Sequence, residues 1–190
     1  LALLSCLRSH REPSLVICPA SLVENWTREA RDFAPGLHAR PYQGNKRSLD
    51  FQKLSGKDLV ITSYGTLRAD RARFLKANFS TIIADEAQHF KNPSTETARV
   101  MHRLSAKSRF ALTGTPIENS LTDLEGIGKF ALAGVFDNRS GAVSPSSPEL
   151  ILAKARPYLL RRTKREVLKD LPEKWESRRF VGFSEKQQKL

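Results

Sequence analysis

Ser80-Thr81-Ile82-Ile83-Ala84-Asp85-Glu86-Ala87-Gln88-His89 is the stretch that decides the fold. Its first half, 80–84, is short and apolar without alternation, which is typical of a parallel strand buried on both faces. Two adjacent carboxylates follow at the end where open α/β sheets bind ligands. Such a pair can hold a hydrated magnesium ion and orient a water at a nucleotide phosphate. The alternative is that Asp85 caps the next helix and Glu86 is solvated.

Further strands and helices alternate around this stretch. Strands are predicted at 14–20, 38–43, 58–64 and 108–112. Helices are predicted at 22–33, at 46–54, through 67–75, at 95–104 and at 121–132. The first of them is expected to be capped by Ser21 and to face the core with Trp26 and Phe33. Four apolar strands lack in-out alternation, so the pattern predicts an α/β fold with a mainly parallel sheet and helices on both faces. A loop at 134–148 and a helical C-terminal extension follow.

Composition narrows the class of protein. The chain has 190 residues, 39% hydrophobic and 27% charged, which fits a globular domain with a real core. No apolar run approaches the roughly 20 residues of a membrane-spanning helix, so no membrane partner is expected. Two cysteines, Cys6 and Cys18, make neither a disulfide framework nor a zinc site. They favour a reducing, intracellular location, in the cytoplasm, nucleoid or nucleus.

The charge is strongly basic and unevenly spread. The net charge is +12, and residues 151–190 hold 12 Lys and Arg against 5 Asp and Glu. This balance favours a polyanionic partner such as nucleic acid. The alternative is a solvated basic tail without a partner, which is common for charge alone.

Polar clusters stand at the carboxyl ends of four predicted strands, at 19–21, 62–64, 85–86 and 113–115. In a parallel sheet these ends share one edge, so the four clusters are expected to line a single ligand site.

With these motifs in place, the chain resembles the first RecA-like lobe of the Swi/Snf family of DNA-dependent ATPases, in helicase superfamily two. Asp85-Glu86-Ala87-Gln88 resembles the family's Walker B box, and the run 113–119 (Thr-Gly-Thr-Pro-Ile-Glu-Asn) resembles motif III. The runs 17–22 and 61–64 resemble motifs Ia and Ib, and 160–164 (Leu-Arg-Arg-Thr-Lys) resembles the basic segment that leads to the second lobe. In this order the boxes are highly specific.

The resemblance implies a role for each matching residue. Asp85 would hold the magnesium of Mg-ATP and Glu86 would orient the attacking water, as catalytic residues of an ATP hydrolase. The implied nucleotide site consists of Asp85, Glu86, Gln88, Thr113, Gly114 and Thr115. The implied contacts to double-stranded DNA are Pro19, Ser21, Thr62, Tyr64, Lys91, Arg161, Arg162 and Lys164. The alternative is capping and turn formation for the hydroxyl residues and core packing for Tyr64 and Trp26, and core packing is preferred for Trp26.

The sequence also departs from the family. The phosphate-loop pattern G-x-x-x-x-G-K-[ST] is missing, since Asp58 follows Gly56-Lys57 and Phe130 follows Gly128-Lys129. We therefore expect a truncated first lobe at 1–133, a variable loop at 134–148 and a basic helical segment at 149–190 leading to a second lobe that the sequence lacks. Such a fragment is expected to be inactive by itself, inside a longer ATP-dependent double-stranded DNA translocase.

Two alternatives stay open. One is a lobe of a DEAD/DEAH-type RNA or DNA helicase, against which Gln88, Lys91-Asn92 and Arg161-Arg162 argue. The other is a basic nucleic-acid-binding module without catalysis, which the charge and the missing phosphate loop favour.

Overall fold

The computed structural model describes residues 11–114 and 121–132, together with 153, 155–162, 177 and 179. The chain divides into two compact units, Leu1–Pro157 and Tyr158–Leu190. All strands described below belong to the first unit. Residues 1–10 and the predicted loop at 134–148 lie outside the described residues, as does most of the predicted extension at 149–190.

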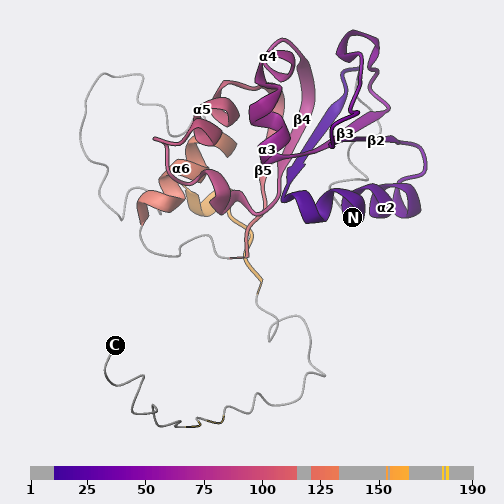
Figure 1. Cartoon of the computed structure of the whole chain (residues 1–190). Coiled ribbons are helices and arrows are strands. Elements are labelled where there is room, and N and C mark those ends of the chain that lie inside the picture. Colours follow the sequence, from indigo (N-terminus) through magenta and orange to yellow (C-terminus); the bar gives the residue numbers. More distant parts are fainter. Residues whose placement is uncertain are drawn as a thin grey trace, which may run out of the picture. The chain divides into compact units, whose positions relative to one another are not determined.

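A five-stranded parallel sheet forms the centre of the first unit (Figure 1). The strands are β1 (Ser14–Cys18), β2 (His38–Tyr42), β3 (Asp58–Ser63), β4 (Asn78–Ala84) and β5 (Ser105–Ala111), in the spatial order β2-β3-β1-β4-β5. In the register, Ile17 of β1 lies beside Thr62 of β3 and beside Ala84 of β4. The predicted parallel α/β fold is confirmed, and β5 begins three residues earlier than predicted.

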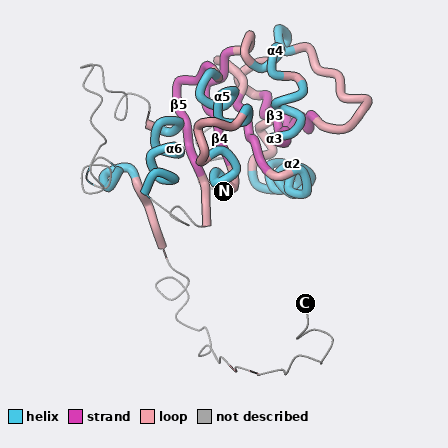
Figure 2. Tube along the Cα trace, turned by 60° about the vertical axis from the view of Figure 1, so that its left-hand side comes forward, coloured by secondary structure: helices cyan, strands magenta, loops and turns pink. Residues whose placement is uncertain are grey.

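Helices connect the strands and cover the sheet. The α-helices are α2 (Val23–Phe33), α3 (Tyr64–Ala69), α4 (Arg71–Phe74), α5 (Glu96–Arg103) and α6 (Leu121–Ala131). The 3₁₀ helices are η2 (Ala20–Leu22), η3 (Phe51–Lys53), η4 (Ala87–Phe90) and η5 (Arg156–Tyr158). Figure 2 shows the same elements as a tube.

The apolar side chains of the central strands alternate between two clusters, one on each face of the sheet. Leu15 and Ile17 of β1 belong to the larger cluster, which also takes in side chains of α3, α5 and α6. Val16 and Cys18 belong to the smaller cluster, which takes in side chains of α2. Because β1, β3 and most of β4 are buried on both faces, their sequences read as continuous apolar runs.

Three local predictions were wrong. Residues 46–54 form no α-helix: the carboxylate of Asp50 accepts from the backbone N–H of Gln52 and caps the short η3 instead. Phe33 is 56% exposed, because α2 buries the stripe of Val23, Thr27 and Ala30. Ser21 does not cap α2, whose N-cap residue is Leu22.

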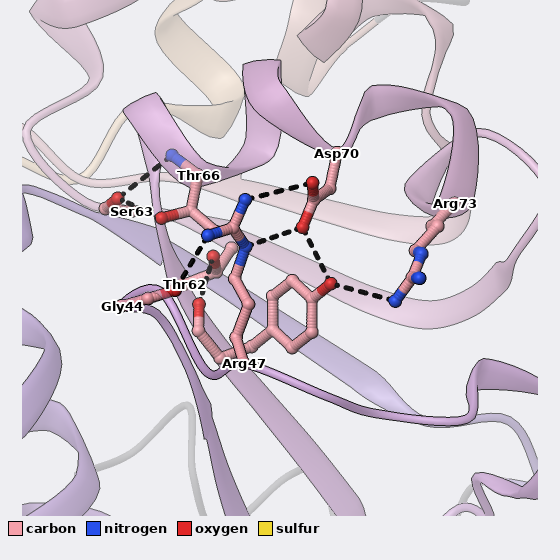
Figure 3. A network of polar contacts seen from close by, with 8 residues as sticks. Gly44, Arg47, Thr62, Ser63, Thr66, Asp70 and Arg73 are labelled. Carbon is pink, nitrogen blue, oxygen red and sulfur yellow. Dashed lines mark hydrogen bonds and ion pairs between the residues drawn. The ribbon is translucent and has the colours of Figure 1, made fainter.

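The predicted helix through 67–75 breaks at Asp70, where a polar network ties it to the end of β2 (Figure 3). The guanidinium of Arg47 donates to both oxygens of Asp70, at 2.6 and 3.0 Å. The hydroxyl of Tyr42 donates to the same carboxylate at 2.7 Å, and Arg73 donates to that hydroxyl at 3.3 Å. These donors hold the pKa of Asp70 down at about 2. A turn at Gly44, with φ of 80°, brings Arg47 back to this carboxylate.

In the described ranges, no helix is both long enough and apolar enough to cross a bilayer.

Candidate functional site

The carboxyl ends of β1, β3, β4 and β5 meet at one edge of the sheet, because these four strands are parallel neighbours. Side chains from four segments are joined there by hydrogen bonds. Trp26 comes from α2 and Tyr64 from the start of α3, while Asp85 and Thr113 follow β4 and β5. The four strand ends therefore share one edge as predicted, with Trp26 in place of a residue of 19–21 among the joined side chains, and a ligand site there stays a prediction.

Asp85 is held at its main chain and at its side chain. Its backbone N–H donates to the carbonyl of Ile17 at 2.8 Å, and its own carbonyl accepts the hydroxyl of Tyr64 at 2.7 Å. Its Oδ2 accepts the indole Nε1–H of Trp26 at 2.8 Å, and its Oδ1 accepts the backbone N–H of Glu86 at 3.0 Å. Both carboxylate oxygens are thus oriented by donors.

Glu86 has a left-handed backbone, with φ of 51° and ψ of 54°. It is the one non-glycine residue with positive φ in the described part of the chain. This conformation costs a residue with a side chain roughly 1–2 kcal/mol. The surrounding contacts must offset that cost, as is common where a functional site needs an unusual backbone.

A line of hydrogen bonds runs from β5 to Glu86. The hydroxyl of Thr113 donates to Oε1 of Gln88 at 2.8 Å, and Nε2 of Gln88 donates to Oε2 of Glu86 at 2.7 Å. The two contacts agree on which end of the amide is oxygen, since one partner is a donor and the other an acceptor. The end of β5 is therefore connected to Glu86 through a single side chain.

Backbone bonds and packing anchor the segment that carries these side chains. The N–H of Leu112 donates to the carbonyl of Ala84, and the N–H of Ala87 donates to the carbonyl of Leu112. Phe90, fully buried, packs edge-on against Phe130 of α6 at 5.1 Å between ring centroids. These contacts tie the segment that carries the acidic pair to β5 and to α6.

Burial shapes the ionisation of two neighbours of Asp85. Loss of solvent, and then the nearby Asp85 carboxylate, raises the pKa of the Cys18 thiol to about 12. The same two causes, in the same order, raise the pKa of the Tyr64 phenol. Tyr64 therefore stays protonated at neutral pH and acts as a donor to the Asp85 carbonyl.

The carboxylate oxygens of the site are suitable ligands for a hydrated magnesium ion. Each oxygen of Asp85 accepts one hydrogen bond, so each keeps a lone pair for a further ligand. Across the described ranges, no group of three or more His, Cys, Asp or Glu side chains could cage a metal. Magnesium needs no such cage, because it is usually bound by one or two carboxylates together with waters and substrate phosphates.

The residues predicted to contact DNA are placed unevenly. Thr62 is fully buried and its hydroxyl donates to the carbonyl of Tyr42, so in this conformation its side chain cannot reach a nucleic acid. Tyr64 is 7% exposed and its hydroxyl is bound to Asp85, which makes it a support of the acidic pair. Ser21 is exposed, while Pro19 and Lys91 are half-buried.

Other predicted residues lie elsewhere in the chain. Gly114 is exposed beside Thr113, and Arg161 and Arg162 are exposed in the second unit. Thr115 and Lys164 lie outside the described residues.

Trp26 is the site residue that the sequence reasoning missed. Its ring packs beside the smaller core cluster, as predicted, but its N–H donates to Asp85. One signal could have pointed to it. The helix that follows β1 must begin at the carboxyl edge of the sheet, so a residue one turn into that helix can reach the end of a neighbouring strand.

The five-stranded parallel sheet, with an Asp-Glu pair after the inner strand β4, agrees with the predicted RecA-like lobe. The chain belongs to the SNF2-related domain family, whose profile matches residues 2–190. It is 36% identical over 196 residues to the putative ATP-dependent helicase/translocase YwqA of Bacillus subtilis, covering 95% of this chain and 21% of that protein. It is 31% identical over 210 residues to the chromatin-remodeling ATPase INO80 of Candida albicans, covering 94% of this chain and 15% of that protein.

A solved structure supports the same assignment. The SWI2/SNF2 ATPase core of Sulfolobus solfataricus in complex with dsDNA is similar, with a TM-score of 0.72 and 33% sequence identity. The match covers 90% of this chain and 39% of that one. The chain therefore spans about a fifth or less of the curated relatives named above, and under half of that ATPase core.

Proposed function

We propose that this chain is part of an ATP-dependent double-stranded DNA translocase that couples Mg-ATP hydrolysis to movement on DNA. The observation that carries the proposal is the oriented acidic pair, with Asp85 fixed by Trp26 and Glu86 connected to Thr113 through Gln88. The names of the relatives and the DNA-bound structural neighbour support it.

In this proposal the two carboxylates divide the work. The free lone pairs of Asp85 would hold the magnesium ion through its waters, and the bound ion would neutralise charge on the nucleotide phosphates. Glu86 would orient the attacking water and accept its proton, because its carboxylate is half-exposed beside Asp85.

Gln88 would change its hydrogen bonds when a nucleotide binds, and this change would affect other parts of the lobe. In this structure its amide is engaged by Glu86 on one side and by Thr113 on the other. A phosphate that attracts the amide N–H groups of Gln88 would compete with Glu86 for them. That exchange would release Glu86 for the water and shift the segment after β5, which contains Thr113, Gly114 and Thr115.

The DNA partner is proposed from charge and from the neighbours. The net charge of +12 suits contacts to a phosphate backbone, which hold DNA without reading its bases. The proposed contacts are Pro19 and Ser21 after β1, Lys91 after η4, and Arg161, Arg162 and Lys164 further along the chain. A second RecA-like lobe of the same protein would complete the site, in an intracellular setting.

The test is DNA-stimulated ATP hydrolysis by the full-length protein that contains this chain. We expect Glu86→Gln to lower turnover by a factor of 100 or more, on the order of a lost catalytic base, while nucleotide binding persists. The 190-residue chain by itself, which has no phosphate-loop pattern, should show no turnover. Full activity in Glu86→Gln, or Glu86-dependent turnover by the isolated chain, would contradict the proposal.

A further inference from the structure

We infer that the indole N–H of Trp26 is a positioning group for Asp85, which sets the direction in which this carboxylate presents its oxygens to magnesium. The inference rests on the proposed function, because it assigns Trp26 a task in the same site. It concerns a residue that sequence reasoning places only in the core.

The two donors to the Asp85 carboxylate differ in kind. The N–H of Glu86 belongs to the next residue along the chain, so it follows the carboxylate wherever the local backbone goes. Trp26 lies 59 residues away and approaches from α2, at 2.8 Å from Oδ2. Within the described residues it is the one side chain that donates to this carboxylate, so it alone ties Oδ2 to a separate element.

The position of the indole is itself fixed by packing. Trp26 is partly buried against the smaller core cluster, which includes Val23 and Ala30 of the same helix. An indole has two side-chain torsions and donates through one N–H in the ring plane, so a packed ring points its donor in one direction. Core packing accounts for a large apolar ring at position 26, and the hydrogen bond to Asp85 accounts for a ring that carries an N–H donor.

The remaining contacts to Asp85 act on its backbone. The hydroxyl of Tyr64 and the carbonyl of Ile17 both bond to main-chain atoms of Asp85. These contacts would keep the residue in place after loss of the indole N–H, and the carboxylate could then rotate about χ1 and χ2. We therefore expect Trp26→Phe to weaken magnesium binding without unfolding the lobe.

The expected magnitude follows from the role of outer-shell partners. Removing a group that orients a metal-binding carboxylate typically lowers metal affinity by a factor of about 10–100. Trp26→Phe in the full-length protein should therefore raise the Mg²⁺ concentration for half-maximal ATPase activity by at least about tenfold. At saturating Mg²⁺ turnover should return to within a few-fold of the wild-type value. Phe33→Leu, which changes an exposed aromatic residue of the same helix, is the matched control and should leave the Mg²⁺ dependence unchanged.

A second readout needs no nucleotide, metal or activity. In the 190-residue chain labelled with ¹⁵N at tryptophan, the indole N–H signal of Trp26 is distinguished from that of Trp175 with a Trp175→Phe variant. Asp85→Ala should shift the Trp26 signal and speed its hydrogen exchange by roughly 10- to 100-fold, as expected for loss of a hydrogen bond to a charged acceptor. Asp32→Ala, which removes an exposed carboxylate of α2, should change neither.

The outcomes separate this inference from the proposed function. A Trp26 indole signal that is unmoved by Asp85→Ala overturns the inference, even if Trp26→Phe fails to fold. A folded Trp26→Phe protein whose Mg²⁺ dependence stays within twofold of wild type also overturns it. A full-length wild-type protein without ATPase activity refutes the proposed function instead, and the indole measurement still decides whether Trp26 donates to the Asp85 carboxylate.

Discussion

Gly126 of α6 lies against the backbone of Lys91, immediately after η4. A Cβ atom built on Gly126 would stand 2.1 Å from the carbonyl oxygen of Lys91 and 3.0 Å from its carbonyl carbon. Neither atom belongs to a flexible side chain, so relief requires α6 or the Lys91 segment to move. Gly126→Ala therefore has two opposite effects on stability, because the steric clash destabilises the fold while the better helix propensity of alanine stabilises it.

We expect the destabilisation by the clash to exceed the gain in helix propensity. Alanine in a helix interior is favoured over glycine by about 1 kcal/mol. Overpacking in a well-packed interior costs typically 1–3 kcal/mol, and a backbone contact this short belongs at the upper end. The net effect is a loss of about 2 kcal/mol, which for a domain of this size corresponds to a melting temperature lower by roughly 4–8 °C.

Thermal and urea unfolding of the chain, followed by circular dichroism, measure this difference. Gly65→Ala is the matched control, since Gly65 is an exposed helical glycine whose added Cβ would find its nearest atom, Oγ of Ser63, at 3.9 Å. That variant should be as stable as wild type or more stable by up to about 1 kcal/mol. A Gly126→Ala protein that melts at or above the wild-type temperature would refute the packing argument. Because the N–H of Lys91 donates to the carbonyl of Gln88, the same variant should also perturb Gln88.

Three further predictions concern single groups of the described structure. Arg47 and Tyr42 lower the pKa of Asp70 from 3.8 to about 2, so its carboxylate stabilises the fold above pH 4 and loses that contribution as the pH falls toward 2. The free energy of unfolding in urea should therefore depend less on pH in Asp70→Asn than in the wild type across this window. An identical pH dependence in the two proteins would count against the network. Glu86→Gly should exceed Glu86→Ala in stability by about 1–2 kcal/mol, because only glycine adopts the left-handed backbone freely, and equal urea midpoints would argue against that backbone. The pKa of Cys18 is raised from 9.0 to about 12, so little reactive thiolate is present at pH 8. In a Cys6→Ser background, Cys18 should therefore react with iodoacetamide on the order of a thousandfold more slowly than a free thiol. Labelling at the free-thiol rate would contradict its burial.

The fold and the convergence of the site could be predicted because both follow from simple patterns. The predicted strands at 14–20, 58–64 and 80–84 are largely apolar and lack in-out alternation, which is typical of strands buried on both faces of a parallel sheet with helices on each side. Once the sheet is parallel, polar residues after each strand must share one edge. Asp85 and Glu86 needed no knowledge of packing to be placed there.

The contacts within the site could not be predicted, because they depend on relative positions that no local pattern encodes. Whether Trp26 faces Asp85 depends on the angle at which α2 crosses the sheet. Thr62 was assigned to the edge, but the pairing of Tyr42 with Thr62 keeps it inside the ladder. In the segment 46–54, Arg47 bonds to a distant carboxylate and Asp50 caps a turn, so tertiary and local side-chain contacts override helix propensity.

The position of β1 has a consequence for how the chain folds. This strand is at the centre of the sheet but is the first of the described strands in the sequence, and its side chain at Ser14 meets that of Ser80 at a separation of 66 residues. During synthesis the apolar run 14–18 can pair with β3 only after residue 63 has emerged, and with β4 only after residue 84. Loops of this length are slow to close, and an unpaired apolar strand is prone to aggregate while it waits. Among the described strands, the one at the centre of the sheet is therefore the one that stays unpaired longest in a nascent chain.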